Sequence, residues 1–132
     1  AVSSYHLEAA IACVHCTSES FESTDWRTIT GLYARLLHDH PNPFIELNYA
    51  IALYYYREKH LAFSILNELQ RHPVLGQYYL LNSALGKFYH LEGKDTVARQ
   101  FLLKAYEQTH LTKEKVFIQK MLDELEVGNQ LR

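Results

Sequence analysis

The sequence predicts an all-α fold, and two features support this prediction. Apolar residues recur at spacings of three and four through each segment of the chain, which is the spacing of one helix face. Proline and glycine are scarce, and Pro41, Pro43, Pro73 and Gly93 fall between those segments, where such residues end or start helices. No candidate β-strand remains.

Seven helices joined by short connections are expected, and residues with a capping or terminating preference mark their ends. Thr24 or Asp25 caps the second helix, and Asn42 followed by Pro43 starts the third. Gly93 ends the fifth helix. The predicted helices cover residues 5–16, 26–40, 43–57, 61–70, 76–91, 95–109 and 112–126, with a polar loop over 17–24, and Asp95 and Thr112 cap the last two.

An internal repeat predicts how these helices are arranged. The spacing of the tetratricopeptide (TPR) pattern is matched, with asparagine in place of the usual tryptophan, by Asn82, Leu85, Gly86, Tyr89, Gly93, Ala98, Leu102 and Ala105. One repeat earlier the equivalent positions hold Ala50, Leu53, Ala62, Leu66 and Leu69. Small residues at Ala50, Ala62, Gly86 and Ala98 would let paired antiparallel helices approach closely.

The expected architecture is therefore a single domain over residues 1–132, made of stacked TPR-like hairpins in an α-α superhelix. The first two helices form a more divergent pair, and the final helix caps the stack with a polar outer side. That side carries Lys113, Glu114, Lys115, Lys120, Asp123, Glu124 and Glu126. An unrelated helical bundle is the alternative.

Composition excludes several classes of function. The formal charge of −2 comes from 13 basic and 15 acidic residues without a block of one sign, so direct DNA binding is not expected. No apolar run approaches the roughly 20 residues that span a bilayer, and no signal peptide is recognisable. We expect a cytoplasmic protein without a membrane segment.

Few residues suggest chemistry of their own. Cys13, His15 and Cys16 are compatible with a zinc site or a redox pair, or with small residues packed on a helix. A structural zinc site needs four ligands, and His6, His38 and His40 are the remaining candidates. We expect no metal and no cofactor.

An enzyme is not expected either, because the chain has no glycine-rich phosphate loop, nucleophile elbow or HExxH motif. Neither a catalytic residue nor a small-molecule substrate is predicted. Histidines stand at predicted helix ends, where an imidazole can complement the last carbonyls. They are His40, His60, His72 and His110.

The concave side of such a stack is the predicted binding site, since it usually takes an extended peptide or a partner helix. The helix register directs toward it Phe44, Leu47, Asn48, Ile51, Tyr54, Tyr55, Ser83, Lys87 and His90. Asn48 and Lys87 would hold a peptide backbone or carboxylate, and Tyr54 and Tyr55 would offer flat apolar contact. Alternatively, Leu47 and Ile51 belong to the core and the tyrosines pack against neighbouring helices.

One family matches the first half of the chain in detail. The matching strings are residues 5–12 (YHLEAAIA), 24–26 (TDW), 32–33 and 36–37 (LY, LL), 41–43 (PNP) and 47–52 (LNYAIA). They closely resemble the C-terminal, TPR-like domain of a group of bacterial extracytoplasmic-function (ECF) sigma factors. The resemblance implies a role in transcription initiation, through contacts with the factor's own DNA-binding domains, RNA polymerase or a regulator.

The chain departs from that family in two places. Tyr49 stands where members commonly have arginine, and the turn around residues 57–59 lacks their common glycine. The promoter-reading domains are absent, so the chain resembles a fragment of a longer protein. The alternatives are a free-standing TPR adaptor or co-chaperone that binds peptides, and a metal-dependent enzyme or sensor that uses Cys13, His15 and Cys16.

Overall fold

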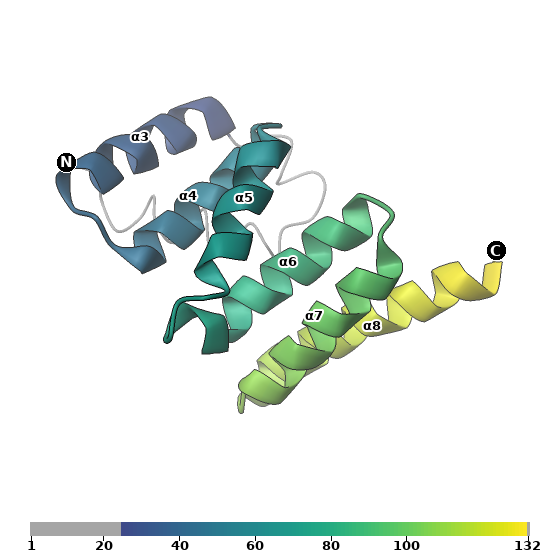
Figure 1. Cartoon of the computed structure of the whole chain (residues 1–132). Helices are drawn as coiled ribbons and strands as arrows, with labels where there is room; N and C mark the ends of the chain where they lie inside the picture. The colour runs from purple at the N-terminus through teal and green to yellow at the C-terminus, as the bar shows by residue number, and fades with distance from the viewer. Residues whose placement is uncertain (1–24, 132) are drawn as a thin grey trace. The chain divides into compact units, whose positions relative to one another are not determined.

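The computed structural model describes the backbone of residues 25–131 and the side chains of residues 25–127, and this part of the chain is helical without a strand (Figure 1). The predicted helix over 5–16 and the loop over 17–24 lie outside the described residues. The α-helices are α3 (Trp26–Asp39), α4 (Pro43–Tyr55), α5 (Lys59–Leu69), α6 (Tyr79–Leu91), α7 (Asp95–Gln108) and α8 (Thr112–Leu131), and a 3-10 helix, η2, spans Leu75–Gln77. No helix in this range is both long and apolar enough to cross a membrane.

Two predicted caps are confirmed at the start of the chain's described part. The Asp25 Oδ1 atom accepts a hydrogen bond from the backbone N–H of Thr28 at 3.2 Å. At α4, the Asn42 Oδ1 atom accepts from the N–H of Phe44 at 2.8 Å, and Pro43 occupies the first turn, where its missing N–H is tolerated. These contacts satisfy backbone donors that a helix start leaves open.

The predicted caps of the last two helices are wrong. Lys94 is the N-cap residue of α7, so Asp95 is its first helical residue. Thr112 likewise lies inside α8 as its first residue. A carboxylate in a first helical turn still interacts favourably with the helix dipole, which explains why Asp95 suits this position.

Several predicted boundaries also change, since α4 ends at Tyr55 instead of Arg57 and α5 begins at Lys59 instead of Leu61. The segment predicted as one helix over 76–91 is interrupted at Tyr78, whose extended backbone (φ −90°, ψ 121°) separates η2 from α6. The last helix continues to Leu131 instead of ending near Glu126. One glycine in a helix costs only about 1 kcal/mol, so Gly128 does not end α8.

Two helices end with a residue in the left-handed region of backbone conformation. Gly93 has a φ of 80° after α6, and Arg57 has a φ of 72° after α4. Around Arg57 the N–H of Glu58 bonds the carbonyl of Leu53, and the N–H of Lys94 bonds Tyr89 in the same way around Gly93. Arg57 thus occupies a turn position that favours glycine.

The chain divides into two compact units between Leu69 and Gln70, and each is described by itself. In the first unit, α4 packs against both α3 and α5 (Figure 1). Its core is formed by Trp26, Ile29, Tyr33, Leu47, Ala50, Ile51, Leu53, Ala62, Leu66 and Leu69. Helix α4 has buried residues on almost every side, because it packs against neighbours in several directions. A helix in this position is expected to be apolar all round, without a polar face.

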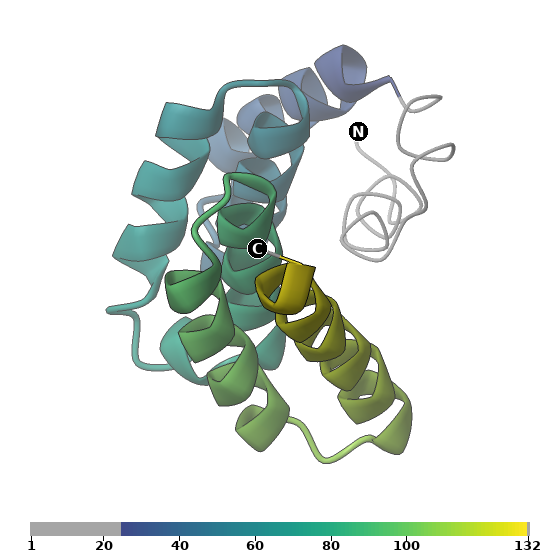
Figure 2. The same ribbon diagram turned by 90° about the vertical axis from the view of Figure 1, so that its right-hand side faces the viewer.

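In the second unit, α6 and α7 form a closely packed hairpin and α8 lies beside α7 (Figure 2). One apolar cluster joins α7 and α8 through Ala98, Leu102, Ala105, Ile118, Leu122 and Leu125. The hairpin depends on Gly86, because a Cβ atom there would stand 2.6 Å from the Leu102 side chain and 3.2 Å from the Ala98 carbonyl oxygen. This close approach agrees with the role predicted for the small residues.

Candidate functional site

The predicted binding residues of the first unit all lie on α4, and most of them are buried. Phe44, in the first turn, is 44% exposed. Leu47 and Ile51 lie in the core with 1% and 0% exposure. Phe44 is therefore the predicted contact residue that α4 presents to solvent, and the two aliphatic residues serve packing.

Tyr54 and Tyr55 take part in an aromatic cluster within this unit. The Tyr55 ring stacks on Trp26 of α3 with ring centroids 4.7 Å apart. The Tyr54 ring meets the edge of Phe63 of α5 at 5.8 Å, and the Lys59 ammonium lies 5.5 Å from its centroid. Offset and edge-on aromatic pairs contribute about 0.5 to 1.5 kcal/mol each beyond burial. The two rings thus fix α3 and α5 against α4.

Asn48 differs from its neighbours because it is polar, 6% exposed and incompletely bonded. Its Oδ1 atom is buried without a hydrogen-bond partner, and so is the hydroxyl oxygen of Thr30 on α3. A buried polar group without a partner costs about 1 to 3 kcal/mol. Because the Oδ1 atom is enclosed by the protein, a donor from a bound partner would recover that free energy only after the side chains that cover the atom move aside.

The predicted binding residues of the second unit lie on α6. Ser83 is fully buried, and its hydroxyl oxygen has no hydrogen-bond partner. Lys87 is half-buried. His90 is held at the end of the helix, where its Nδ1 atom lies 2.9 Å from the Asp95 Oδ1 atom of α7. Because the α4 and α6 residues belong to separate units, a common groove formed by both stays a prediction.

Sequence reasoning identified Asn82 as a substitution in the repeat but missed the polar network around it. The buried Asn82 amide donates to Gln108 Oε1 at 2.7 Å and accepts a hydrogen bond from Gln70 Nε2. Gln108 also donates to the Gly76 carbonyl at 3.1 Å, and Lys104 donates to Gln70 at 3.3 Å. The network fastens the segment before α6 to the hairpin, and no local spacing in the sequence could have indicated it.

A second polar cluster lies between α6 and α8. Burial raises the pKa of the Tyr79 hydroxyl above its ordinary value of 10.0, and a hydrogen bond to Glu114 with the charge of that carboxylate raises it further. Burial also raises the pKa of Tyr78. The Thr109 hydroxyl donates a hydrogen bond to Glu114 as well. Glu114 therefore connects the starts of α6 and α8.

His72 does not complement helix carbonyls as predicted for the histidines at helix ends. Its Nδ1 atom accepts hydrogen bonds from the backbone N–H groups of Val74 and Leu75, each at 3.1 Å. The His72 imidazole therefore caps the start of η2, where the first backbone N–H groups have no partner within the helix. His60 lies in the first turn of α5, where the open backbone groups are also donors.

Over residues 25–127, no three His, Cys, Asp or Glu side chains gather where they could hold a metal ion. The candidate ligands Cys13, His15 and Cys16 lie outside the described residues.

Comparison with known proteins gives one informative relative. No protein-family model matches the chain, and no solved structure matches it significantly. An uncharacterized protein of Rhizobium meliloti (strain 1021) is 29% identical over 121 residues, which cover 92% of this chain and 28% of that protein. The chain thus spans little more than a quarter of the relative's length.

Proposed function

We propose that this chain is the TPR-like, non-catalytic interaction domain of a bacterial ECF sigma factor and that it regulates transcription initiation in the cytoplasm. The observation that carries the proposal is the string of family-like residues from Tyr5 to Ala52. Several of these have defined structural roles. Asn42 and Pro43 start α4, and Trp26 stacks on Tyr55 to hold α3 against α4.

Two consecutive hairpins support the TPR-like part of the proposal. Ala50 of α4 and Ala62 of α5 are fully buried, and these two helices pack against each other. Gly86 and Ala98 take the equivalent places where α6 meets α7, at a distance that leaves no room for a Cβ atom on Gly86. Helix pairs that repeat the same close approach are what a TPR-like stack requires.

The length of the relative fits a domain of a larger protein, since the matching region is 28% of that chain. In this proposal the promoter-reading domains belong to other parts of the gene product. The partner is one of those domains, RNA polymerase or a regulator. The proposal fails if the complete gene product contains no sigma-factor domains before Ala1.

Asn48 gives the proposal a point of contact. Its unpartnered Oδ1 atom is buried, so a partner that docks on the exposed ring of Phe44 one turn earlier would donate a backbone N–H to it only by displacing the side chains that cover it. Binding would then supply the hydrogen bond that the Asn48 Oδ1 atom lacks in the folded chain. An Asn48→Leu substitution keeps a similar volume and removes the acceptor.

The test uses the full-length gene product with core RNA polymerase in an in vitro transcription assay. We expect Asn48→Leu to change transcript output several-fold while the protein stays folded. Asn67→Leu is the matched control, because Asn67 is an exposed asparagine on α5, a different helix, where its side-chain amide donates to the Phe63 carbonyl. Equal output from the two variants and the parent protein would contradict the role of Asn48.

A free-standing TPR adaptor is the alternative, and the unpartnered Asn48 is compatible with it because a peptide could supply the same donor. A pull-down with immobilised peptides and, separately, with core RNA polymerase distinguishes the two functions. The sigma-factor proposal expects retention of the polymerase in the presence of the gene product's other domains, and the adaptor expects retention by peptides alone.

A further inference from the structure

One face of α8 carries a symmetric row of exposed side chains, which we call the α8 stripe: Val116, Lys120, Asp123 and Val127. Val116 is 63% exposed and Val127 is 55% exposed, and the two charged residues between them are also exposed. Spacings of four, three and four residues place all four side chains on one side of a helix. The same spacing forms the contact row of paired helices.

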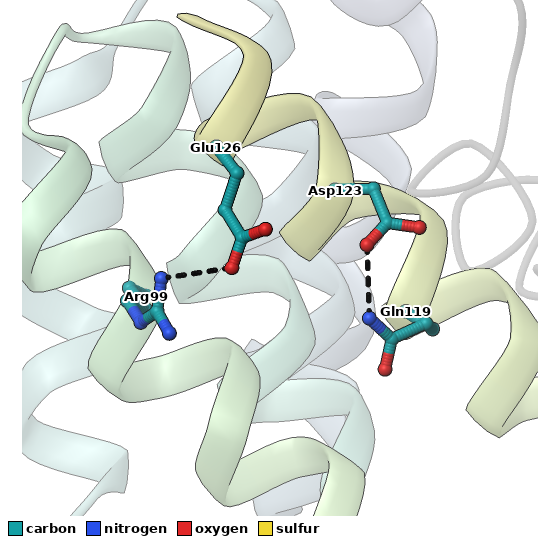
Figure 3. Close-up of polar contacts among 4 residues, drawn as sticks. All are labelled: Arg99, Gln119, Asp123 and Glu126. Carbon is teal, nitrogen blue, oxygen red and sulfur yellow. Dashed lines mark hydrogen bonds and ion pairs between the residues drawn. The ribbon is translucent and has the colours of Figure 1, made fainter. Parts of the chain in front are cut away.

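The stripe points away from the core of its own unit. Ile118, Leu122 and Leu125 fill the opposite side of α8 and are buried against α7. Figure 3 shows that Glu126 reaches toward Arg99 of α7, with 3.3 Å between the charged atoms, whereas the Asp123 side chain points away from Arg99. Asp123 accepts a hydrogen bond from Gln119 of the same helix at 3.0 Å.

The charges of α8 are separated along the helix. Its first half carries Lys113, Lys115 and Lys120 together with Glu114, whose carboxylate bonds Thr109, and its second half carries Asp123, Glu124 and Glu126. A pocket of about 530 Å³ opens over the basic half. Its lining consists of Tyr106, Thr112, Lys115, Val116, Gln119, Lys120 and Asp123. An acidic helix carrying an apolar side chain complements this surface.

The second half of α8 itself has that character. We propose that the α8 stripe is a self-association surface, on which the α8 helices of two copies of this chain pair in antiparallel orientation. Lys120 of one copy then faces Asp123 of the other, and Val116 faces the other copy's Val127. The acidic half of each helix covers the pocket over the basic half of its partner.

A two-fold axis explains why a second copy fits better than an unrelated helix. The stripe has the order valine, lysine, aspartate, valine, with spacings of four, three and four residues. When two copies of the helix lie antiparallel, this order brings opposite charges together and valine next to valine. An isologous interface requires this kind of self-complementarity. The stripe extends over only about 17 Å of helix, so we expect a weak dimer that forms with increasing concentration.

The test is sedimentation equilibrium of the 132-residue chain over a wide range of concentration, at low and high salt. We expect a monomer–dimer equilibrium that weakens with salt. Lys120→Glu and Asp123→Lys, each alone, should weaken dimerisation at least tenfold because like charges then face each other. The double variant Lys120→Glu/Asp123→Lys restores opposite charges and should recover most of the association.

Glu68→Lys is the control, since it reverses an exposed charge on α5. Circular dichroism checks that each variant keeps its helical content. A chain that stays monomeric at every concentration would overturn the proposal, and so would a dimer that neither single reversal weakens. The inference does not depend on the sigma-factor function, so its failure leaves that proposal unaffected.

Discussion

Two glycines inside helices differ at the scale of single atoms. A Cβ atom on Gly86 would meet Leu102 and the Ala98 carbonyl of the facing helix, whereas a Cβ atom on Gly31 of α3 would have nothing within 4 Å. Replacing glycine by alanine in a helix gains up to about 1 kcal/mol from backbone entropy. The surroundings therefore decide the sign of the change.

We predict that Gly86→Ala lowers the free energy of unfolding by about 1 to 3 kcal/mol, because the overpacked hairpin must open or Leu102 must leave its rotamer. Gly31→Ala is expected to raise it by up to about 1 kcal/mol. Urea unfolding followed by circular dichroism measures both. A stabilising Gly86→Ala would contradict the close approach of α6 and α7 at this position.

The left-handed turn after α4 leads to a second prediction at this scale. Arg57 has a positive φ, which costs a residue with a side chain about 1 to 2 kcal/mol in the folded state. Glycine avoids this cost, but its more flexible backbone stabilises the unfolded state and offsets part of the gain. We expect Arg57→Gly to raise the free energy of unfolding by about 0.5 to 1 kcal/mol. Gly93→Ala, at the equivalent turn, should lower it by a similar amount.

At the scale of elements, the periodic parts of the chain were predictable and the boundaries with non-local causes were not. Helix α4 begins where Asn42 and Pro43 indicated, because a cap is a local interaction. The break at Tyr78 was missed, since it is fixed by Gln108 and Asn82, which bond the Gly76 carbonyl from α7 and α6. Whether the candidate site residues are exposed or buried likewise depends on packing between helices, which the periodicity of a single helix does not predict.

The junction of α6 and α8 predicts the response to alkaline pH. The pKa of Tyr79 is raised in the folded chain, so the unfolded chain releases this proton first as the pH increases. The associated stability is complete below about pH 10 and is lost at higher pH. We expect Tyr79→Phe to make the loss of stability between pH 9 and 11 shallower, and the exposed Tyr56→Phe to leave it unchanged. Parallel curves for both variants would contradict this assignment.

The start of α3 predicts the response to acid. Hydrogen bonds from the Thr28 hydroxyl and backbone lower the pKa of Asp25, with a smaller contribution from Arg27. A lowered pKa contributes stability that is present above the ordinary value of 3.8 and is lost as the pH falls through the folded-state value. We expect Asp25→Asn, which keeps an acceptor, to reduce the acid sensitivity of α3 in unfolding curves below pH 4.

At the scale of the whole molecule, the proposed function combines two kinds of support. Trp26, one of the residues that resemble the sigma-factor domain, stacks on Tyr55 and holds α3 against α4, and in the second unit α6 and α7 pack closely at Gly86. In the two proposals, a partner that opens the cover of the buried Asn48 acceptor would bond it, and the α8 stripe would bind a second copy. Partner binding and self-association would use different helices.

The central claim is that this domain controls the output of a sigma factor, and one measurement tests it most directly. Transcription from a cognate promoter by core RNA polymerase is measured with the full-length gene product and with the same product lacking the segment from Ala1 to Arg132. We predict a several-fold change in transcript output on deletion, in either direction, with promoter recognition retained. Equal output from the two proteins, or no polymerase-dependent transcription from the full-length product, would contradict the claim.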